Sequence, residues 1–121
     1  MNDAIRKALA TERRIDITTT GRTSGKPHRM EIFFHSLEDA VYISGHPGHR
    51  DWYANLLTEP RFTFHLKESI QADIAARATP IHDPVQRRDI ITRIHQKTKL
   101  YEGQLEAWVQ RSPLVLVDLE L

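Results

Sequence analysis

Residues 15–34 read IDITTTGRTSGKPHRMEIFF and contain two alternating segments on either side of a glycine-bearing turn. Apolar side chains take every other position in both segments, at Ile15, Ile17, Met30, Ile32 and Phe34. A period of two is typical of β-strands with one buried face. Gly21 and Gly25 lie in the turn between the segments and tolerate positive φ. This stretch therefore predicts two consecutive strands joined by a turn over 21–27.

The rest of the chain shows further changes of hydrophobic period. Alternating or β-branched segments predict four more strands, over 40–44, 62–66, 70–76 and 114–121. Helices are predicted over 4–10, 52–57 and 102–110, with Asp51 as the cap of the second. A further helix is predicted to begin at Asp83-Pro84, with Asp83 as its cap and with Ile90, Ile91 and Ile94 on one face. Six short strands with few helices predict a mainly β fold (β plus α), a small closed or half-open barrel with short flanking helices.

Length and composition narrow the class of protein. The chain of 121 residues is expected to form one domain over 1–121, with no linker or repeat. It contains no cysteine, which excludes disulfides, thiolate metal sites and a cysteine nucleophile. The N-terminus is charged and no apolar segment suits a signal peptide or a membrane span, so we expect a cytoplasmic protein. A net charge of +1 gives no general attraction for nucleic acid.

The turn after the first strand carries a local excess of positive charge. Arg22, Lys26, His28 and Arg29 fall within eight residues that contain no acid. Backbone N–H groups, hydroxyls and cations in such a turn can converge on an anion such as phosphate. An exposed hairpin turn with solvated basic residues is the other interpretation, and the residues alone leave both open.

A second loop, 44–52, also contains two glycines and leads into a helix N-terminus, where backbone N–H groups favour anions. His49 and Arg50 add to this potential. A plain connection between strand and helix is the alternative. In the helix that follows, Trp52 and Leu56 are most simply core residues, whereas Asn55 can reach a ligand or cap backbone groups.

Other kinds of site receive less support. His46 and His49 are separated by Pro47 and have no third ligand fixed nearby by the sequence, so we expect no metal. The Gly-x-Ser-x-Gly motif of a nucleophile elbow is absent.

These motifs together resemble the deazaflavin-dependent nitroreductase family, whose fold is shared with pyridoxamine-phosphate-oxidase-like, FMN-binding proteins. The resemblance rests on the segment 18–27, on Trp52-Tyr53-Ala54-Asn55-Leu56, and on Pro60-Arg61-Phe62-Thr63 shortly after it. It covers about the middle half of the chain. It implies a six-stranded split β-barrel that is usually dimeric and binds a flavin-like cofactor in a groove along the barrel.

The resemblance also implies which residues contact the cofactor, an 8-hydroxy-5-deazaflavin coenzyme with FMN as the alternative. They belong to the first turn and the strand after it, to the second loop and to the helix: Arg22, Thr23, Ser24, His28, Met30, Glu31, Ile32, Phe33, Ser44, Gly45, His49, Arg50 and Asn55. Two positions depart from the family pattern. Thr23 replaces a frequent lysine, and Met30-Glu31 replaces an Asn-Pro pair. A carboxylate at Glu31 then requires a cation, for which Arg29 or Arg50 is expected.

The activity that the resemblance implies is hydride transfer from the reduced cofactor to a small quinone-like or nitro acceptor. Phe33 and Ile43 are expected to form apolar walls, Ser44 or Tyr53 to offer a hydroxyl, and Tyr101 and Trp108 to line the acceptor side. No catalytic acid is assigned. Alternatives within the same fold are an FMN oxidoreductase and a non-enzymatic module that binds flavin or haem.

Overall fold

The computed structural model describes residues 2–38, 40–100 and 102–121. These residues form four helices and six strands in this order: α1 (Asp3–Thr11), β1 (Arg14–Thr20), β2 (Pro27–Leu37), β3 (Ala40–Ser44), α2 (Asp51–Thr58), β4 (Arg61–Leu66), β5 (Ala72–Pro80), α3 (Pro84–Thr98), α4 (Leu105–Arg111) and β6 (Leu114–Leu119). Within the described part of the chain, no helix is both long and apolar enough to cross a membrane.

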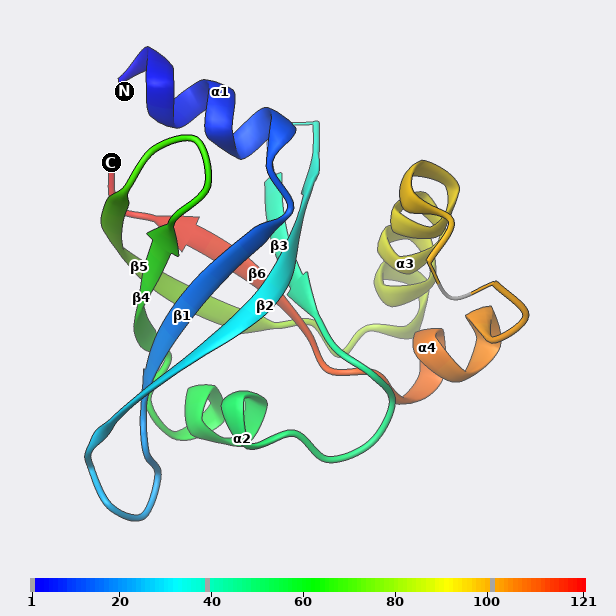
Figure 1. The fold of residues 1–121 in the computed structure, drawn as a ribbon. Coiled ribbons are helices and arrows are strands. Elements are labelled where there is room, and N and C mark those ends of the chain that lie inside the picture. The colour runs from blue at the N-terminus through cyan, green and yellow to red at the C-terminus, as the bar shows by residue number, and fades with distance from the viewer. Residues whose placement is uncertain (1, 39, 101) are drawn as a thin grey trace.

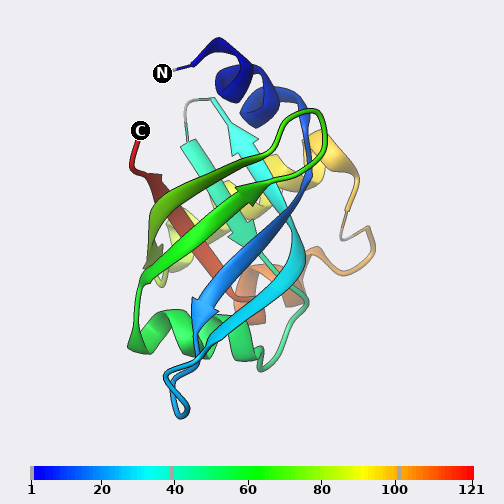
Figure 2. The same ribbon diagram turned by 60° about the vertical axis from the view of Figure 1, so that its left-hand side comes forward.

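The six strands close into an antiparallel barrel in the order β1-β2-β3-β6-β5-β4 (Figures 1 and 2). β1 and β2 form the predicted hairpin, with Thr20 opposite Pro27 and Ile15 opposite Ile32. Figure 1 shows the turn of this hairpin extending beyond the barrel, at the end where α2 lies. The prediction of a six-stranded, mainly β barrel with short helices is confirmed.

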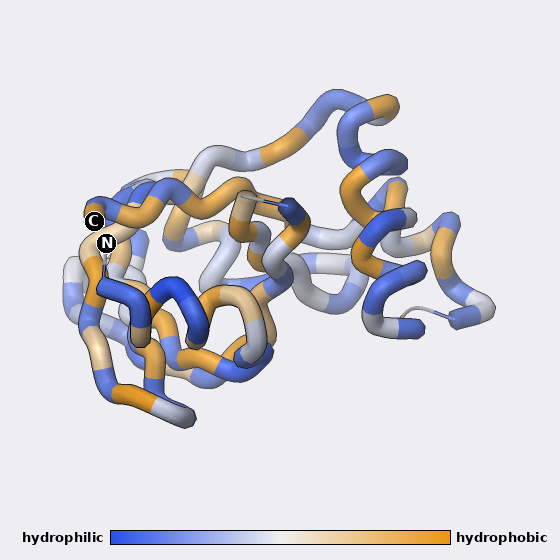
Figure 3. Tube along the Cα trace, turned by 90° about the horizontal axis from the view of Figure 1, so that it is seen from above, coloured by the Kyte–Doolittle hydropathy of each residue, from blue (hydrophilic) through white to orange (hydrophobic). Residues whose placement is uncertain are grey.

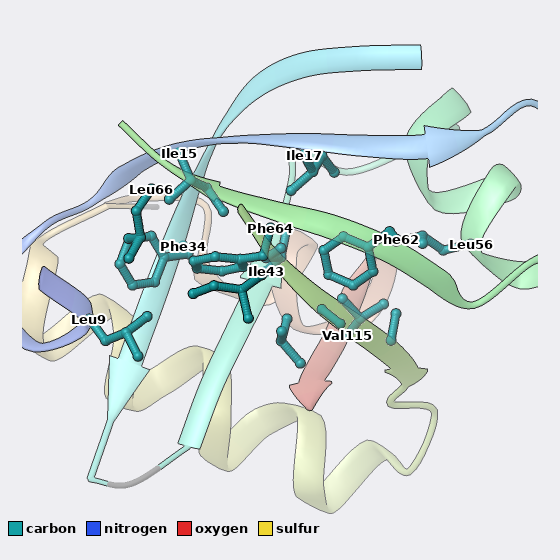
Figure 4. Packing of buried hydrophobic residues seen from close by; sticks show 14 of the residues in the cluster. Leu9, Ile15, Ile17, Phe34, Ile43, Leu56, Phe62, Phe64, Leu66 and Val115 are labelled. Atoms are coloured by element: carbon teal, nitrogen blue, oxygen red, sulfur yellow. The ribbon is translucent and has the colours of Figure 1, made fainter. Parts of the chain in front are cut away.

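The interior of the barrel holds the alternating apolar residues (Figure 4). Ile15, Ile17 and Ile43 are fully buried there. Phe34 from β2 meets Phe64 from β4 edge to face, with 5.3 Å between ring centroids. Aromatic pairs of this geometry contribute about 0.5–1.5 kcal/mol beyond the area they bury. The closed interior therefore leaves only the outer faces and ends of the barrel for a ligand.

A second apolar cluster lies outside the barrel, where α3 and α4 pack together beside it (Figure 1). Ile90, Ile91 and Ile94 recur along α3 with helical spacing and are buried, as predicted, while the other side of the helix is hydrophilic (Figure 3). Arg87 on α3 joins the two helices, because its buried guanidinium donates to the carbonyl oxygens of Val109 at 2.8 Å and Ser112 at 2.6 Å. The position of α4 therefore depends on α3.

Some predicted boundaries differ from the observed ones. β2 runs from Pro27 to Leu37 because it pairs with β1 over its first half and with β3 over its second. β5 covers 72–80 instead of 70–76, since Ala78 continues its buried face. The expected cap of α2 is wrong: Arg50 holds the N-cap position and Asp51 is the first helical residue. Asp83 does cap α3, accepting a hydrogen bond from the N–H of Gln86 at 2.8 Å.

Candidate functional site

The turn between β1 and β2 is compact because Gly21 has no side chain. A Cβ at this position would lie 2.6 Å from both His28 Nε2 and Ser24 Oγ, closer than real contacts allow. The N–H of Gly21 donates to the carbonyl of Lys26, and Gly25, at φ +71°, donates back to the carbonyl of Gly21. Ser24 and His28 therefore fold over the backbone of Gly21.

Asn55 fixes this turn to α2. Its Oδ1 accepts from the backbone N–H of Arg22 at 3.1 Å and from the Arg22 guanidinium at 2.9 Å, while its Nδ2 donates to Thr19 Oγ1 at 3.2 Å. The Arg22 guanidinium also meets the exposed carboxylate of Asp51 at 3.1 Å. Hydrogen bonds from His49, and then from Arg22, hold the pKa of Asp51 below its usual value. Arg22 is thus held beside α2 by an amide and a carboxylate.

A cavity of about 330 Å³, called here the turn cavity, opens between this turn and α2. It brings together six of the predicted site residues, Arg22, Thr23, Ser24, His28, Met30 and Asn55. Thr19, Gly21, Asp51 and Trp52 complete its lining. Five of the ten lining residues come from 21–28, so a ligand here would meet the backbone and side chains of the turn.

A second cavity, of about 520 Å³, lies between β2 and the segment that leads into α4, and is called here the β2–α4 cavity. Five further predicted residues line it, namely Glu31, Ile32, Phe33, Ser44 and Gly45. Trp108, one of the two residues predicted to line the acceptor side, also lines this cavity, and the other, Tyr101, lies outside the described residues. Met30 lines the turn cavity and Glu31 the β2–α4 cavity, so consecutive residues of β2 border the two.

The carboxylate of Glu31 is paired, although not with the cation expected. Its partner is Lys67 at the end of β4, which also binds Asp16 at 2.7 Å. Arg29 pairs with Asp16 at 3.0 Å and not with Glu31. Hydrogen bonds to Asp16 and Glu31 raise the pKa of Lys67, so this ammonium keeps its charge. Expecting Arg29 or Arg50 as the partner was wrong, because β4 lies beside β1 and brings Lys67 close.

Several other expected contacts lie elsewhere. The guanidinium of Arg50 turns back onto the carbonyls of His49 and Pro47, at 2.8 and 3.3 Å, and lines a separate cavity beside α4. His49 is exposed and pairs with Asp51 at 3.2 Å. Ile43 points into the barrel core and cannot form a wall of either cavity, so that expectation was wrong.

The two candidate hydroxyls differ in position. Ser44 lines the β2–α4 cavity, but its hydroxyl donates to the carbonyl of Pro113 at 2.8 Å. Tyr53 lies in another cavity, beside Arg87 and between α2 and α3, where burial raises the pKa of its phenol. Neither hydroxyl is therefore directed at the space beside β2.

The structure adds site residues that the sequence interpretation missed. His35 and His46 line the β2–α4 cavity, with Leu100, Glu102 and Gln104 from the segment before α4. The alternation of β2 contained a signal for one of them, since His35 continues the outward-facing series of Glu31 and Phe33. Among the residues described, no three His, Asp or Glu side chains form a group that could hold a metal ion.

Comparison with solved structures shows that the fold recurs in proteins of several kinds. A conserved hypothetical protein from Mycobacterium tuberculosis matches at a TM-score of 0.75 and 14% identity, covering 100% of this chain and 82% of the other. HutZ, the haem storage protein from Vibrio cholerae, matches at a TM-score of 0.75 and 12% identity, covering 99% of this chain and 90% of HutZ. An F420-H2 dependent reductase, FDR-A, matches at a TM-score of 0.67 and 16% identity, covering 88% of this chain and 95% of FDR-A. At these identities the likeness shows the fold alone.

The sequence itself gives a more specific result. A comparison with curated proteins yields no match. The family model described as F420H(2)-dependent quinone reductase, however, matches residues 3–120 and thus spans all the elements that form both cavities. The chain belongs to the F420H2-dependent quinone reductase family, whose members use the reduced deazaflavin F420H2 to transfer hydride to quinone acceptors.

Proposed function

We propose that this protein holds F420 along β2, with the phosphate-bearing side chain of the coenzyme in the turn cavity and its ring in the β2–α4 cavity, where a quinone is reduced. The observation that carries this proposal is the fixed position of Arg22. Asn55 holds both its backbone N–H and its guanidinium at the mouth of a glycine turn. The family model supplies the coenzyme and the acceptor class.

The chemistry of the turn suits an anionic group. The ten residues 21–30 contain four basic or imidazole side chains and no acid. A side chain at Gly21 would displace Ser24 and His28, so glycine here lets these two side chains pack over the turn and line the turn cavity. Arginine can donate two parallel hydrogen bonds to a phosphate. The carboxylate of Asp51 opposes an incoming anion and must give up part of its contact with Arg22.

The β2–α4 cavity suits a flat, largely apolar ring. Ile32 and Phe33 supply apolar surface from β2, and Leu100 and Trp108 add apolar surface to the lining from the segment before α4 and from α4. Lys67 neutralises the nearby carboxylate of Glu31. The cavity therefore offers stacking and hydrophobic contact with no uncompensated negative charge from β2.

The side chains of this protein bind and orient, and the redox chemistry belongs to the coenzyme. When bound, F420H2 supplies the hydride that reduces the quinone. Arg22 and Asn55 set the position of the coenzyme along β2, Phe33 provides a stacking surface, and Trp108 limits access of water. Catalysis of this kind depends mainly on bringing two reactants together in the right orientation.

We further propose a homodimer as the working form. Met30 and Phe33 border the cavities, and their relative exposures of 38% and 42% are high for such large apolar residues. A second copy packed against β2 would remove this apolar surface from water. Sedimentation equilibrium with and without F420 tests the proposal. A dimer that dissociates in Phe33→Ser supports it, and a monomer at all protein concentrations contradicts it.

The cofactor assignment is tested by fluorescence titration of the purified protein with F420 and, separately, with FMN. We expect saturable binding of F420 and oxidation of F420H2 that depends on added menadione. Binding of FMN alone, or F420H2 oxidation that does not respond to a quinone, would overturn the proposal.

A further inference from the structure

His35 is a buried imidazole whose ring has no partner among the residues that the structure describes. It lies on β2 with a relative exposure of 5% and lines the β2–α4 cavity. The other deeply buried histidine, His65, is bonded at both nitrogens, to Thr18 at 2.7 Å and to Asp73 at 2.7 Å. The ring nitrogens of His35 are not fully enclosed, so water can bond them when the cavity is empty, and a ligand in the β2–α4 cavity can take the place of that water.

The surroundings of His35 keep its ring neutral. Burial lowers the pKa of His35 from 6.5 to about 4, and the positive charges of Arg13 and Lys97 add to the effect. His35 lines two cavities: a small one that Glu12, Arg13 and Lys97 also line, and the β2–α4 cavity, which Glu31 and Glu102 line. A neutral imidazole carries one N–H donor and one acceptor nitrogen. At pH 7, His35 can thus donate one hydrogen bond without carrying charge.

Quinone reduction creates a need for such a donor. Addition of a hydride to a quinone Q gives the hydroquinone monoanion, QH⁻, with the negative charge on a quinone oxygen, and one proton from solvent then completes QH₂. Donors placed where negative charge develops give large rate enhancements in a site that excludes water. Ser44 lines the same cavity, but its hydroxyl already donates a hydrogen bond to the carbonyl oxygen of Pro113.

We propose that the ring N–H of His35 donates a hydrogen bond to the quinone oxygen on which negative charge develops, making His35 a catalytic residue of the acceptor side. This inference rests on the proposed function, because it places the quinone in the β2–α4 cavity. His35 acts as a neutral donor and gives up no proton. The rate therefore does not follow the titration of an ordinary histidine between pH 5.5 and 8.

Three variants test this role. His35→Phe removes the donor and keeps a planar ring, His35→Gln keeps an N–H donor, and His82→Phe changes an exposed histidine in a different cavity. We expect kcat with menadione to fall about 100-fold in His35→Phe, as for loss of one oxyanion donor. We expect it to recover to within about tenfold of wild type in His35→Gln and to stay unchanged in His82→Phe. The F420 dissociation constant should stay within about twofold in all three.

A second readout does not need the coenzyme. 4-Nitrophenolate resembles the hydroquinone monoanion, and its binding to the protein alone can be followed by calorimetry. We expect about tenfold weaker binding in His35→Phe and near-wild-type binding in His35→Gln. Equal kcat and equal phenolate affinity in wild type and His35→Phe would overturn the role of His35, as would a folded His35→Gln as impaired as His35→Phe. Failure of wild type to bind F420 would instead overturn the proposed function, while the phenolate measurement would still test His35.

Discussion

Asn55 on α2 accepts two hydrogen bonds from Arg22, one from the backbone N–H at 3.1 Å and one from the guanidinium at 2.9 Å. The two residues are 33 positions apart, and this pair of bonds joins the turn of the β1–β2 hairpin to the helix that closes one end of the barrel. Because Asn55 Nδ2 also donates to Thr19, the orientation of the amide is determined. The turn is therefore held before any ligand arrives.

Asn55→Ala should lower both stability and coenzyme affinity. The substitution leaves the Arg22 N–H without its acceptor and removes the bond to Thr19, which we expect to cost about 2 kcal/mol of unfolding free energy. Urea unfolding measures this loss. Leu57→Ala, at an exposed position of the same helix, should change stability by no more than about 0.5 kcal/mol. Equal effects of the two substitutions would contradict the role given to Asn55.

Asp51→Asn should strengthen F420 binding. The exposed carboxylate of Asp51 competes with an incoming anion for Arg22, and its lowered pKa keeps it charged at neutral pH. Asparagine keeps the shape and one acceptor but removes the charge, so we expect about two- to fivefold tighter binding, with little change in stability. Titration of both proteins at low salt measures the difference. Weaker binding by Asp51→Asn would mean that Asp51 positions Arg22 for the ligand.

Gly21→Ala and Gly25→Ala should act in different ways. A Cβ at Gly21 displaces Ser24 and His28, so F420 affinity should fall by about tenfold while the fold survives. A Cβ at Gly25 meets no atom within 4 Å but is strained at φ +71°, which should cost about 1 kcal/mol of stability. Thermal unfolding and F420 titration of both variants separate the effects. Similar affinity losses at the two positions would contradict the contact assigned to Gly21.

The stability of the protein should depend on His35 below neutral pH. The pKa of His35 is about 4 in the folded state against 6.5 for the ordinary group. The unfolded chain therefore binds more protons between these values, and the stability of the folded state falls as pH falls through this window. Relative to His35→Gln, wild type should lose about 3 kcal/mol between pH 7 and pH 4. A difference that does not change with pH would show that His35 is not buried as a neutral ring.

The strands could be predicted from the sequence because their signal is local. Ile15, Ile17 and Phe34 lie inside the barrel at the positions that the alternation assigned to a buried face. The Asp83 cap of α3 was predictable for the same reason, since its hydrogen-bond partner, Gln86, lies only three positions along the chain. The pattern of neighbouring residues is sufficient to predict these strands and this helix cap.

The errors at the candidate site concern long-range contacts. Asp51 looked like a helix cap, but its carboxylate pairs with Arg22, 29 positions away. Glu31 is neutralised by Lys67, 36 positions away, because β1 pairs with both β2 and β4. His35 was overlooked because the cavity beside it exists only once α3 and α4 have packed against the barrel. Such contacts depend on the order of strands in the barrel and on how the helices pack against it, and the hydrophobic pattern specifies neither.

The central claim, that the first turn holds F420 through Arg22, is tested most directly by comparing the F420 affinity of Arg22→Ala with that of Arg77→Ala. Arg77 is exposed on β5, which lies opposite β2 in the barrel order, so its removal controls for loss of one positive charge. We predict at least tenfold weaker binding in Arg22→Ala and no more than a twofold change in Arg77→Ala, with both proteins folded. Equal affinities of the two variants would contradict the account.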